Sequence, residues 1–225
     1  MLVCLFDIDG TLLSSSGSGR LAMDAALVSE FNIRVPILQS QISGRTDRSI
    51  ARDQFALHGI DDTPANWQRF INAYLANLPA SLQRNGGRVL PGVAALVEQL
   101  RNRPDTAVGL LTGNVPEGAR IKLAHFGIDA HFDFGAYGHE HHSRDEVAHS
   151  ALALVRGRYG DALAADRVWV IGDTPWDVRC AHAIGARSVA VATGIYSVGD
   201  LTHENADIVL ADLSDPSRLW DLWDA

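Results

Sequence analysis

Cysteine is scarce in this sequence, which has only two, Cys4 and Cys180, among its 225 residues. Two cysteines cannot form a disulfide framework, and neither lies in a CxxC or similar metal-ligand spacing. This excludes a small disulfide-stabilised scaffold and gives no indication of a cysteine metal site. We expect both side chains to be packed thiols, which is the usual state of a free cysteine.

Long apolar runs and an excess of positive charge are also missing. No apolar stretch approaches the roughly 20 residues that cross a bilayer, and the apolar start, Met1 to Phe6, reaches an aspartate too early for a signal peptide. Nineteen Lys and Arg against 27 Asp and Glu give a net charge of −8, which disfavours general binding to nucleic acid or anionic lipid. We expect a soluble, cytoplasmic monomer or homodimer with no nucleic-acid or membrane partner.

What is present is an ordinary globular composition, with 47% hydrophobic and 20% charged residues, enough for one sizeable core or two small ones. Short apolar runs alternate with segments of helical periodicity, which predicts a parallel sheet covered on both faces, a doubly wound, Rossmann-like α/β fold. The predicted strands span 2–6, 107–111, 168–171, 188–192 and 208–210, with a further one near 131–134. The predicted helices span 91–100, 116–126, 177–184 and 216–223, and another follows the capping box of Ser143 and Glu146.

A helical segment interrupts this alternation after the first strand. The small-residue stretch 14–19 and the pair Gly86-Gly87 are flexible connections that bracket it. Two apolar stripes at helical spacing lie between them: Leu21, Ala25, Val28 and Phe31, and then Trp67, Phe70, Ile71, Tyr74, Leu75 and Leu78. We predict a core domain formed by 1–14 and 88–225, and a small all-helical domain formed by 15–87.

Polar sequences follow three of the predicted strands, where ligands bind in open α/β sheets. They are Asp7-Ile8-Asp9-Gly10-Thr11, Thr112-Gly113-Asn114 and Gly172-Asp173-Thr174-Pro175-Trp176-Asp177. Any single aspartate here could be a helix cap or turn residue. Four clustered carboxylates, however, would repel one another without a cation. Because no His or Cys accompanies these acids, Mg²⁺ suits the site better than Zn²⁺.

These three motifs together resemble the haloacid dehalogenase-like hydrolase superfamily, and within it the phosphatases similar to phosphoglycolate phosphatase, over nearly the whole chain. The resemblance implies that the α/β core carries a helical cap domain after its first strand. It also implies Mg²⁺-dependent hydrolysis of a small phosphorylated metabolite through an aspartyl-phosphate intermediate.

The resemblance assigns a role to each acid. Asp7 would be the nucleophile, and Asp9 would be the general acid and then the base, for which its pKa should lie above that of a free aspartic acid. Asp7, the backbone carbonyl of Asp9 and Asp173 would hold Mg²⁺, with Asp177 supporting the site. The substrate's phosphoryl oxygens would be bound by a further set of residues: Thr112, Gly113 and Asn114, with Gly10 letting the backbone turn away.

One element departs from the family pattern. Such phosphatases usually carry a lysine at the start of the helix before the second acidic motif, where this sequence has Ser143-Arg144-Asp145. Arg144 is the first candidate for the cation that neutralises the nucleophile and the phosphate, and Lys122 is the alternative. Arg144 could otherwise be a solvated first-turn residue.

The insertion resembles a cap that closes over the site and recognises the leaving group. Its polar turn Ser43-Gly44-Arg45-Thr46-Asp47 is similar to the cap loop that faces the active site in phosphoglycolate phosphatase-like enzymes. Arg45 is the candidate to contact a substrate carboxylate or second phosphate. Alternatively, Thr46 or Asp47 caps the next helix and Arg45 is solvated.

Other activities remain open. A sugar-phosphate mutase of the same superfamily would share every core residue. A haloacid dehalogenase is disfavoured by Asp9, because halide displacement needs no acid, and a phosphonate-cleaving enzyme by the absence of lysine from the insertion. A phospho-metabolite sensor without turnover is disfavoured by the intact set of acids.

Overall fold

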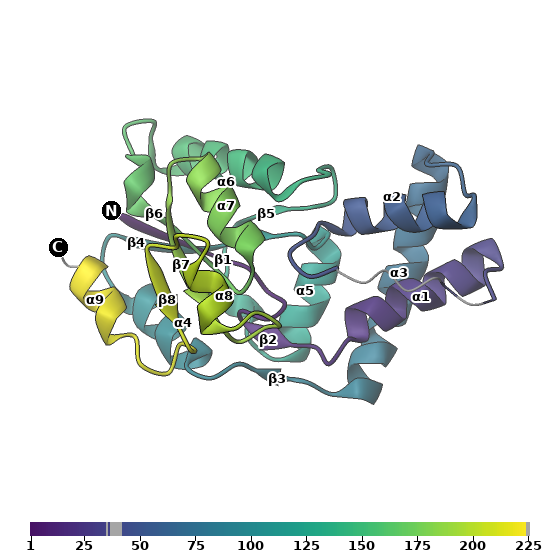
Figure 1. Cartoon of the computed structure of the whole chain (residues 1–225), viewed down its shortest axis with the longest axis horizontal. Coiled ribbons are helices and arrows are strands. Elements are labelled where there is room, and N and C mark those ends of the chain that lie inside the picture. Colours follow the sequence, from purple (N-terminus) through teal and green to yellow (C-terminus); the bar gives the residue numbers. More distant parts are fainter. Residues whose placement is uncertain (35, 37–41, 224–225) are drawn as a thin grey trace.

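The computed structural model describes residues 1–34, 36 and 42–223. Figure 1 shows a sheet with its covering helices at one end of the molecule and a separate group of helices at the other. The sheet is parallel and six-stranded in the described residues, with the order β5-β4-β1-β6-β7-β8. Its strands are β1 (Leu2–Phe6), β4 (Thr106–Thr112), β5 (Gly135–Tyr137), β6 (Val168–Gly172), β7 (Arg187–Val191) and β8 (Ile208–Leu210).

Helices cover both faces of the sheet, as the alternating sequence pattern predicts. The side chains of the central strand β1 alternate between two apolar clusters: Cys4 and Phe6 face one and Val3 and Leu5 the other. The first cluster includes α4 (Val93–Asn102), α5 (Pro116–His125) and α9 (Ser217–Trp223), and the second includes α6 (Arg144–Tyr159) and α7 (Pro175–Ala183). The part of the chain that forms the sheet and its covering helices also contains α8 (Val198–Thr202) and the 3-10 turns η1 (Asp129–His131) and η2 (Ala165–Arg167). Both cysteines are free and buried, which confirms the prediction of packed thiols.

The helical insertion follows the first strand of the sheet, as predicted. It comprises α1 (Ser18–Phe31), α2 (Asp47–His58) and α3 (Pro64–Asn85), which share an apolar cluster of their own. At its base, β2 (Leu13–Ser14) and β3 (Arg88–Val89) pair as a short antiparallel ribbon. This ribbon joins the two ends of the insertion where the sequence indicated flexible connections.

Three local predictions were wrong. In α1, Leu21 and Val28 of the predicted stripe are each 47% exposed, and the buried face one residue further on is made by Ala22, Met23, Ala26 and Leu27. Small alanines on that face allow α1 to pack closely against α3. The connection at 14–19 is shorter than predicted, because β2 ends at Ser14 and α1 begins at Ser18. The strand expected at 131–134 begins only at Gly135, because a 3-10 turn occupies 129–131.

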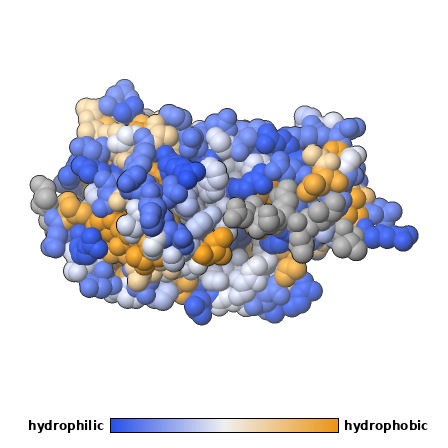
Figure 2. All heavy atoms as spheres, in the orientation of Figure 1, coloured by the Kyte–Doolittle hydropathy of each residue, from blue (hydrophilic) through white to orange (hydrophobic). Residues whose placement is uncertain are grey.

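Most of the surface in Figure 2 is hydrophilic, with smaller hydrophobic patches over the sheet part of the molecule. Within the described ranges, no helix combines the length and the apolar character needed to cross a membrane.

Candidate active site

The three polar strand ends meet at one edge of the sheet. Strand β1 lies between β4 and β6, so the ends of these three strands are neighbours. Asp7 follows β1, Asp173 follows β6, and Thr112 is the last residue of β4. The backbone N–H of Asp7 donates to the carbonyl of Ile171 at 2.9 Å, which extends the pairing with β6 by one residue. The Asp7 side chain is buried at this edge.

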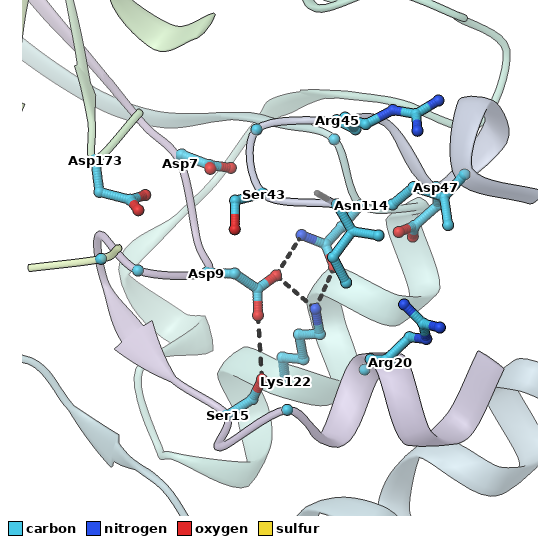
Figure 3. Close-up of a pocket in the computed structure, with 18 of the residues that line it drawn as sticks. Asp7, Asp9, Ser15, Arg20, Ser43, Arg45, Asp47, Asn114, Lys122 and Asp173 are labelled. Atoms are coloured by element: carbon cyan, nitrogen blue, oxygen red, sulfur yellow. Dashed lines mark hydrogen bonds and ion pairs between the residues drawn. The ribbon is translucent and has the colours of Figure 1, made fainter. Parts of the chain in front are cut away.

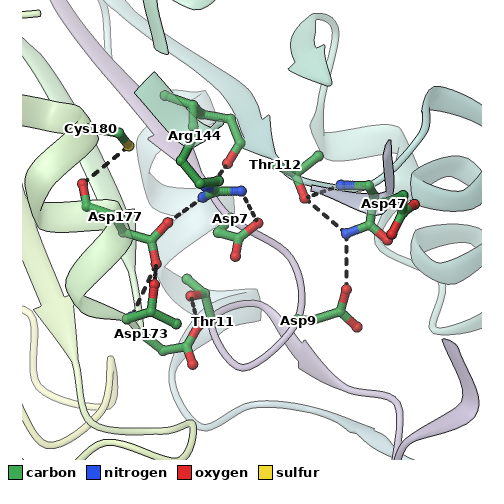
Figure 4. Close-up of polar contacts among 12 residues, drawn as sticks. Asp7, Asp9, Thr11, Asp47, Thr112, Arg144, Asp173, Asp177 and Cys180 are labelled. Carbon is green, nitrogen blue, oxygen red and sulfur yellow. Dashed lines mark hydrogen bonds and ion pairs between the residues drawn. The ribbon is translucent and has the colours of Figure 1, made fainter. Parts of the chain in front are cut away.

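Arg144 is buried beside Asp7. It is the first residue of α6, which starts at the predicted capping box of Ser143 and Glu146. Its guanidinium donates to Asp7 Oδ1 at 3.3 Å, to the carbonyl of Leu111 at 3.3 Å and, through a short contact, to Asp177 Oδ1 (Figure 4). Burial opposes its charge, but the two carboxylates hold the pKa of Arg144 above its ordinary value. Arg144 is therefore a permanently charged neighbour of Asp7.

Three carboxylates gather around this arginine. Asp7, Asp173 and Asp177 each offer an oxygen, and these oxygens lie within 4.8 Å of one another. Burial raises the pKa of Asp7 to about 6 although Arg144 opposes it. Burial, followed by repulsion from Asp177 and Asp7, raises the pKa of Asp173 well above its ordinary value. Three acids with one arginine leave uncompensated negative charge, and all the donors are oxygens, which fits a Mg²⁺ ion.

The members of the cluster differ in what else they bind. Asp177 accepts from Arg144 with one oxygen and from the N–H and hydroxyl of Thr174 with the other. Asp173 accepts from the hydroxyl of Thr11 at 3.0 Å. A Cβ at Gly10, where φ is +84°, would lie 2.3 Å from an Asp173 oxygen, so only glycine allows this approach. Asp177 is suited to orienting Arg144, and Asp173 to facing a cation.

The Asp9 carboxylate joins a different set of partners (Figure 3). Its Oδ2 accepts from Nζ of Lys122 at 2.5 Å and from Nδ2 of Asn114 at 2.9 Å, and its Oδ1 accepts from the hydroxyl of Ser15 at 3.2 Å. Lys122 also donates to Oδ1 of Asn114 at 2.6 Å. Asp9 remains 39% exposed, whereas Lys122 is buried.

The expected rise in the pKa of Asp9 was wrong. Burial raises the pKa of this carboxyl. The positive charge of Lys122 and the hydrogen bonds from Lys122 and Asn114 lower it by more, so the pKa of Asp9 lies below its ordinary value. The expectation relied on repulsion from neighbouring carboxylates, opposed by Mg²⁺ alone, and did not include Lys122, whose Nζ lies 2.5 Å from Oδ2 of Asp9. Of the two cations that the sequence left open, Arg144 contacts Asp7 and Lys122 contacts Asp9.

The turn after β4 connects the sheet edge to the insertion. The hydroxyl of Thr112 accepts from Nδ2 of Asn114 at 2.9 Å and from its backbone N–H at 3.3 Å (Figure 4). The carbonyl of Gly113 accepts from the N–H of Asp47 at 2.8 Å, and a Cβ on Gly113 would lie 2.1 Å from the carbonyl oxygen of Arg45. The turn therefore allows no side chain at Gly113 while the loop of the insertion lies against it.

That loop, residues 43–47, is held by further hydrogen bonds. Thr46 caps α2 by accepting from Ser49 N, and its hydroxyl donates to the carbonyl of His141 at 2.8 Å. Oδ2 of Asp47 accepts from the N–H of Val115 at 2.8 Å. Burial raises the pKa of Asp47 to about 6.

Arg45 is paired within the insertion. Its Nη2 contacts Asp53 at 2.5 Å and the carbonyl of Ser49 at 3.3 Å, and Figure 3 shows its side chain directed away from Asp9. Thr46 is the helix cap, as one of the two interpretations expected. A contact between Arg45 and substrate stays a prediction.

A cavity of about 480 Å³ lies between the sheet edge and the helical insertion. Asp7, Asp9, Arg144 and Asp173 line it from the core, and Arg20, Ser43, Asp47 and Tyr74 line it from the insertion. Sequence reasoning missed Arg20 and Ser15, named Asp47 only as part of the cap loop and a possible helix cap, and placed Tyr74 only in an apolar stripe. The spacing of Arg20 and Asp24 by four residues could have indicated a held arginine, but nothing in the sequence indicates which way it faces.

Comparisons with known proteins show the family and the fold of the chain. The family model described as haloacid dehalogenase-like hydrolase matches residues 4–182. No curated protein gives a significant match.

Solved structures share the fold over nearly the whole chain. A hydrolase from Pseudomonas syringae is 22% identical, with 99% of both chains covered and a TM-score of 0.73. A predicted phosphoglycolate phosphatase from Haemophilus somnus 129PT is 20% identical, with 97% of this chain and 96% of that chain covered and a TM-score of 0.71. A Thermotoga maritima protein provisionally named as a β-phosphoglucomutase is 16% identical, with 99% of both chains covered and a TM-score of 0.62.

Proposed function

Since the chain belongs to the haloacid dehalogenase-like hydrolase family, we propose that it is a Mg²⁺-dependent phosphatase that hydrolyses a small phosphomonoester through an aspartyl-phosphate on Asp7. The observation that carries the proposal is the placement of Asp7. Asp7 directly follows the central strand β1, and its buried carboxylate lines the cavity beneath the insertion. Oδ1 of Asp7 lies 3.3 Å from Nη1 of Arg144. Such a carboxylate can act as a nucleophile toward a phosphoryl group held in line with it.

Asp7, Asp173 and the backbone carbonyl of Asp9 are the groups that would hold Mg²⁺. The two side chains belong to the oxygen cluster at the sheet edge, and Asp177 would keep Arg144 in place from the other side. When bound, the ion would offset the charge of the carboxylates and of the phosphoryl oxygens.

The proposed chemistry has two displacements. An oxygen of Asp7 bonds to phosphorus while the bond to the ester oxygen breaks, and the leaving oxygen takes a proton from Asp9. A water molecule then gives a proton to Asp9 and attacks the phosphorus, which releases phosphate and regenerates Asp7. Arg144, the Thr112 hydroxyl and the backbone N–H groups that follow it would stabilise the phosphoryl oxygens.

The pairing of Asp9 with Lys122 suits the second displacement, in which Asp9 must begin as a base. In the first displacement, the dianionic phosphoryl group would raise the pKa of Asp9 by like-charge repulsion and favour the protonated acid. Binding of substrate would thus supply the protonation state that the free site lacks.

We assign residues 15–87 to a cap that excludes bulk water and contacts the leaving group. Loop 43–47 lies against the turn after β4 and against Val115 through the hydrogen bonds of Asp47. Opening the cap would break these contacts and expose the cavity to substrate.

Phosphate release from a panel of small phosphomonoesters tests the proposal. The panel includes phosphoglycolate, sugar phosphates and nucleoside monophosphates, each assayed with Mg²⁺ or with EDTA. We expect metal-dependent release that Asp7→Asn lowers by about 10³-fold or more, because the amide is not a nucleophile. The matched control is Asp145→Asn, the same change at an exposed aspartate next to Arg144, which should leave release unchanged.

A sugar-phosphate mutase is the second candidate, favoured by the Thermotoga maritima relative. Phosphorus NMR of a sugar phosphate separates the two, since a mutase moves the phosphoryl group between hydroxyls without net release. If the folded protein binds Mg²⁺ but releases phosphate from none of the esters, the phosphatase proposal is contradicted. A mutase or a non-catalytic sensor would then be left.

A further inference from the structure

The cap side of the cavity contains an arginine with unused hydrogen-bonding capacity. Arg20 lies in the first turn of α1, and its Nε donates to both oxygens of Asp24, at 2.9 and 3.1 Å. Its Nη2 is buried and has no hydrogen-bond partner in the part of the chain that the structure describes. Asp24 thus holds the Arg20 guanidinium through Nε, and Nη2 is left without a partner among the described residues.

A second residue that lines the same cavity also carries a donor with no partner among the described residues. Tyr74, on α3, is fully buried, and its hydroxyl has no hydrogen-bond partner among the described residues. Burial, together with the charges of Asp47 and Asp9, raises the pKa of Tyr74 well above its ordinary value, so that the hydroxyl keeps its proton. Buried polar groups in proteins are normally hydrogen-bonded. Nη2 of Arg20 and the hydroxyl of Tyr74 are exceptions among the described residues, as is Nε of Arg144, and all three residues line this cavity. The two donors on the insertion side therefore indicate a ligand.

The positions of these groups relate them to the reacting centre. A Cβ added to Gly19, the residue before Arg20, would lie 3.2 Å from Nζ of Lys122 and 3.9 Å from the hydroxyl oxygen of Tyr74. Lys122 in turn binds Asp9. Figure 3 shows Arg20 on the opposite side of Asp9 from Asp7 and Asp173. With Asp9 facing the leaving oxygen, as proposed above, these donors would lie beyond that oxygen, on the side away from the phosphoryl group.

We propose that Arg20 and Tyr74 form a subsite for an oxyanionic group, a carboxylate or a second phosphate, carried by the leaving group of the phosphomonoester. A guanidinium only donates hydrogen bonds, so its partner must supply acceptor oxygens, and the planar fork suits a carboxylate or phosphate. This inference rests on the proposed function, because it takes Asp9 as the group that faces the leaving oxygen.

The apolar part of the cavity lining fits a short carbon spacer. Met23, Ile42, Ile50 and Ile195 line the cavity together with the charged residues. Apolar contacts of this kind would bind a methylene chain that links the ester oxygen to the distal oxyanion. Arg45, which the sequence favoured for this role, has its guanidinium on Asp53 instead.

The test uses a chain-length series of phosphooxy-carboxylates from phosphoglycolate upward, each matched to the alkyl phosphate of equal length. Alkanediol bisphosphates form a second arm, which distinguishes a carboxylate from a phosphate. We expect kcat/KM for at least one oxyanionic ester to exceed that of its alkyl match by about 10- to 100-fold, the range of one or two hydrogen bonds to a charged group.

Tyr74→Phe and Arg20→Gln should abolish that preference while leaving kcat/KM for the alkyl phosphates within about twofold. The phenylalanine variant removes only a hydroxyl that has no partner among the described residues, so a structural role predicts no change in activity and unaltered stability. Arg69→Gln is the matched control, because Arg69 lies on the same helix as Tyr74 but pairs with Glu30 outside the cavity. Equal hydrolysis of alkyl and oxyanionic esters at every length, or equal losses for both in the variants, would overturn the proposal.

Calorimetry with the matching phosphono-carboxylates, which cannot be hydrolysed, measures binding at the subsite without turnover. It therefore tests the subsite even if the protein proves not to be a phosphatase. If no ester is hydrolysed, tight binding that Tyr74→Phe and Arg20→Gln weaken about tenfold would still support the subsite. Binding that neither variant weakens would refute it.

Discussion

Asp7 and Asp9 are two residues apart in the chain, yet each is paired with a different cation. Burial raises the pKa of Asp7 to about 6 although Arg144 lies beside it, whereas Lys122 helps to hold the pKa of Asp9 below its ordinary value. Lys122 is the only lysine among the 19 Lys and Arg residues. The arginine fork reaches Asp7 and Asp177 together, whereas the lysine is a point charge between Asp9 and Asn114.

Asp47→Asn tests the electrostatic cost of burying the carboxylate of Asp47. Burial raises the pKa of Asp47 to about 6, against about 3.9 in the unfolded chain. The folded state therefore binds more protons, and the contribution of Asp47 to the free energy of unfolding falls as the pH rises from about 4 to 6. Asparagine keeps an acceptor for Val115 without the charge. We expect the variant to be more stable at pH 7, by up to about 3 kcal/mol, and little changed at pH 4.

Urea unfolding at both pH values measures this difference, with the exposed Asp145→Asn as the control for a surface substitution. Each variant is compared with the unsubstituted protein at the same pH, so effects of pH that are common to all the proteins cancel. If Asp47→Asn changed the free energy of unfolding by the same amount at pH 4 and at pH 7, the argument would be refuted.

Helix caps set the positions of active-site residues at the scale of the element. The capping box of Ser143 and Glu146 starts α6 so that its first residue, Arg144, is buried against Asp7 and Asp177. A cap satisfies backbone N–H groups that the first helical turn cannot pair. The cap thus has two effects, on the stability of the helix and on the position of the cation.

Ser143→Ala should therefore lower both stability and activity. Loss of the cap costs about 1 kcal/mol of unfolding free energy, and fraying of the first turn would displace Arg144 and reduce kcat. The matched control is Thr63→Ala, which removes the side-chain cap of α3 outside the lining of the cavity. We expect Thr63→Ala to lose as much stability as Ser143→Ala but to keep its kcat. If kcat fell as much in Thr63→Ala as in Ser143→Ala, the cap of α6 would not act by positioning Arg144.

Protons and Mg²⁺ compete for the same carboxylates in the whole molecule. Burial raises the pKa of both Asp7 and Asp173, and a cation binds their deprotonated forms. We expect Mg²⁺ at about 100 times its Kd to stabilise the protein by about 2.7 kcal/mol at pH 7.5. That increment should shrink as the pH falls below about 6, where Asp7 takes up a proton.

Thermal unfolding with Mg²⁺ or EDTA, at pH 7.5 and at pH 5, checks this linkage. Asp173→Asn should lose most of the increment at pH 7.5, and Asp145→Asn should keep it. An increment that is the same at both pH values would show that the ion does not bind at this cluster.

The sequence alone determined the order of the elements and the chemistry of the strand ends. The apolar runs at 2–6 and 208–210 coincide with β1 and β8, and the box of Ser143 and Glu146 marks the start of α6. These signals are local, since burial on both faces of a strand and the capping of a helix depend on residues a few positions apart. The convergence of Asp7, Thr112 and Asp173 followed from one general rule, that parallel strands end at the same edge of a sheet.

Only the tertiary structure decided which face of α1 is buried and which side chain each charged group binds. The hydrogen bond between Lys122 and Asp9 spans 113 residues, and that between Arg144 and Asp7 spans 137. The face of α1 depends on packing against α3, which left Arg20 in the cavity and Leu21 exposed. Such pairings depend on the relative placement of whole elements, and local periodicity carries no information about that placement.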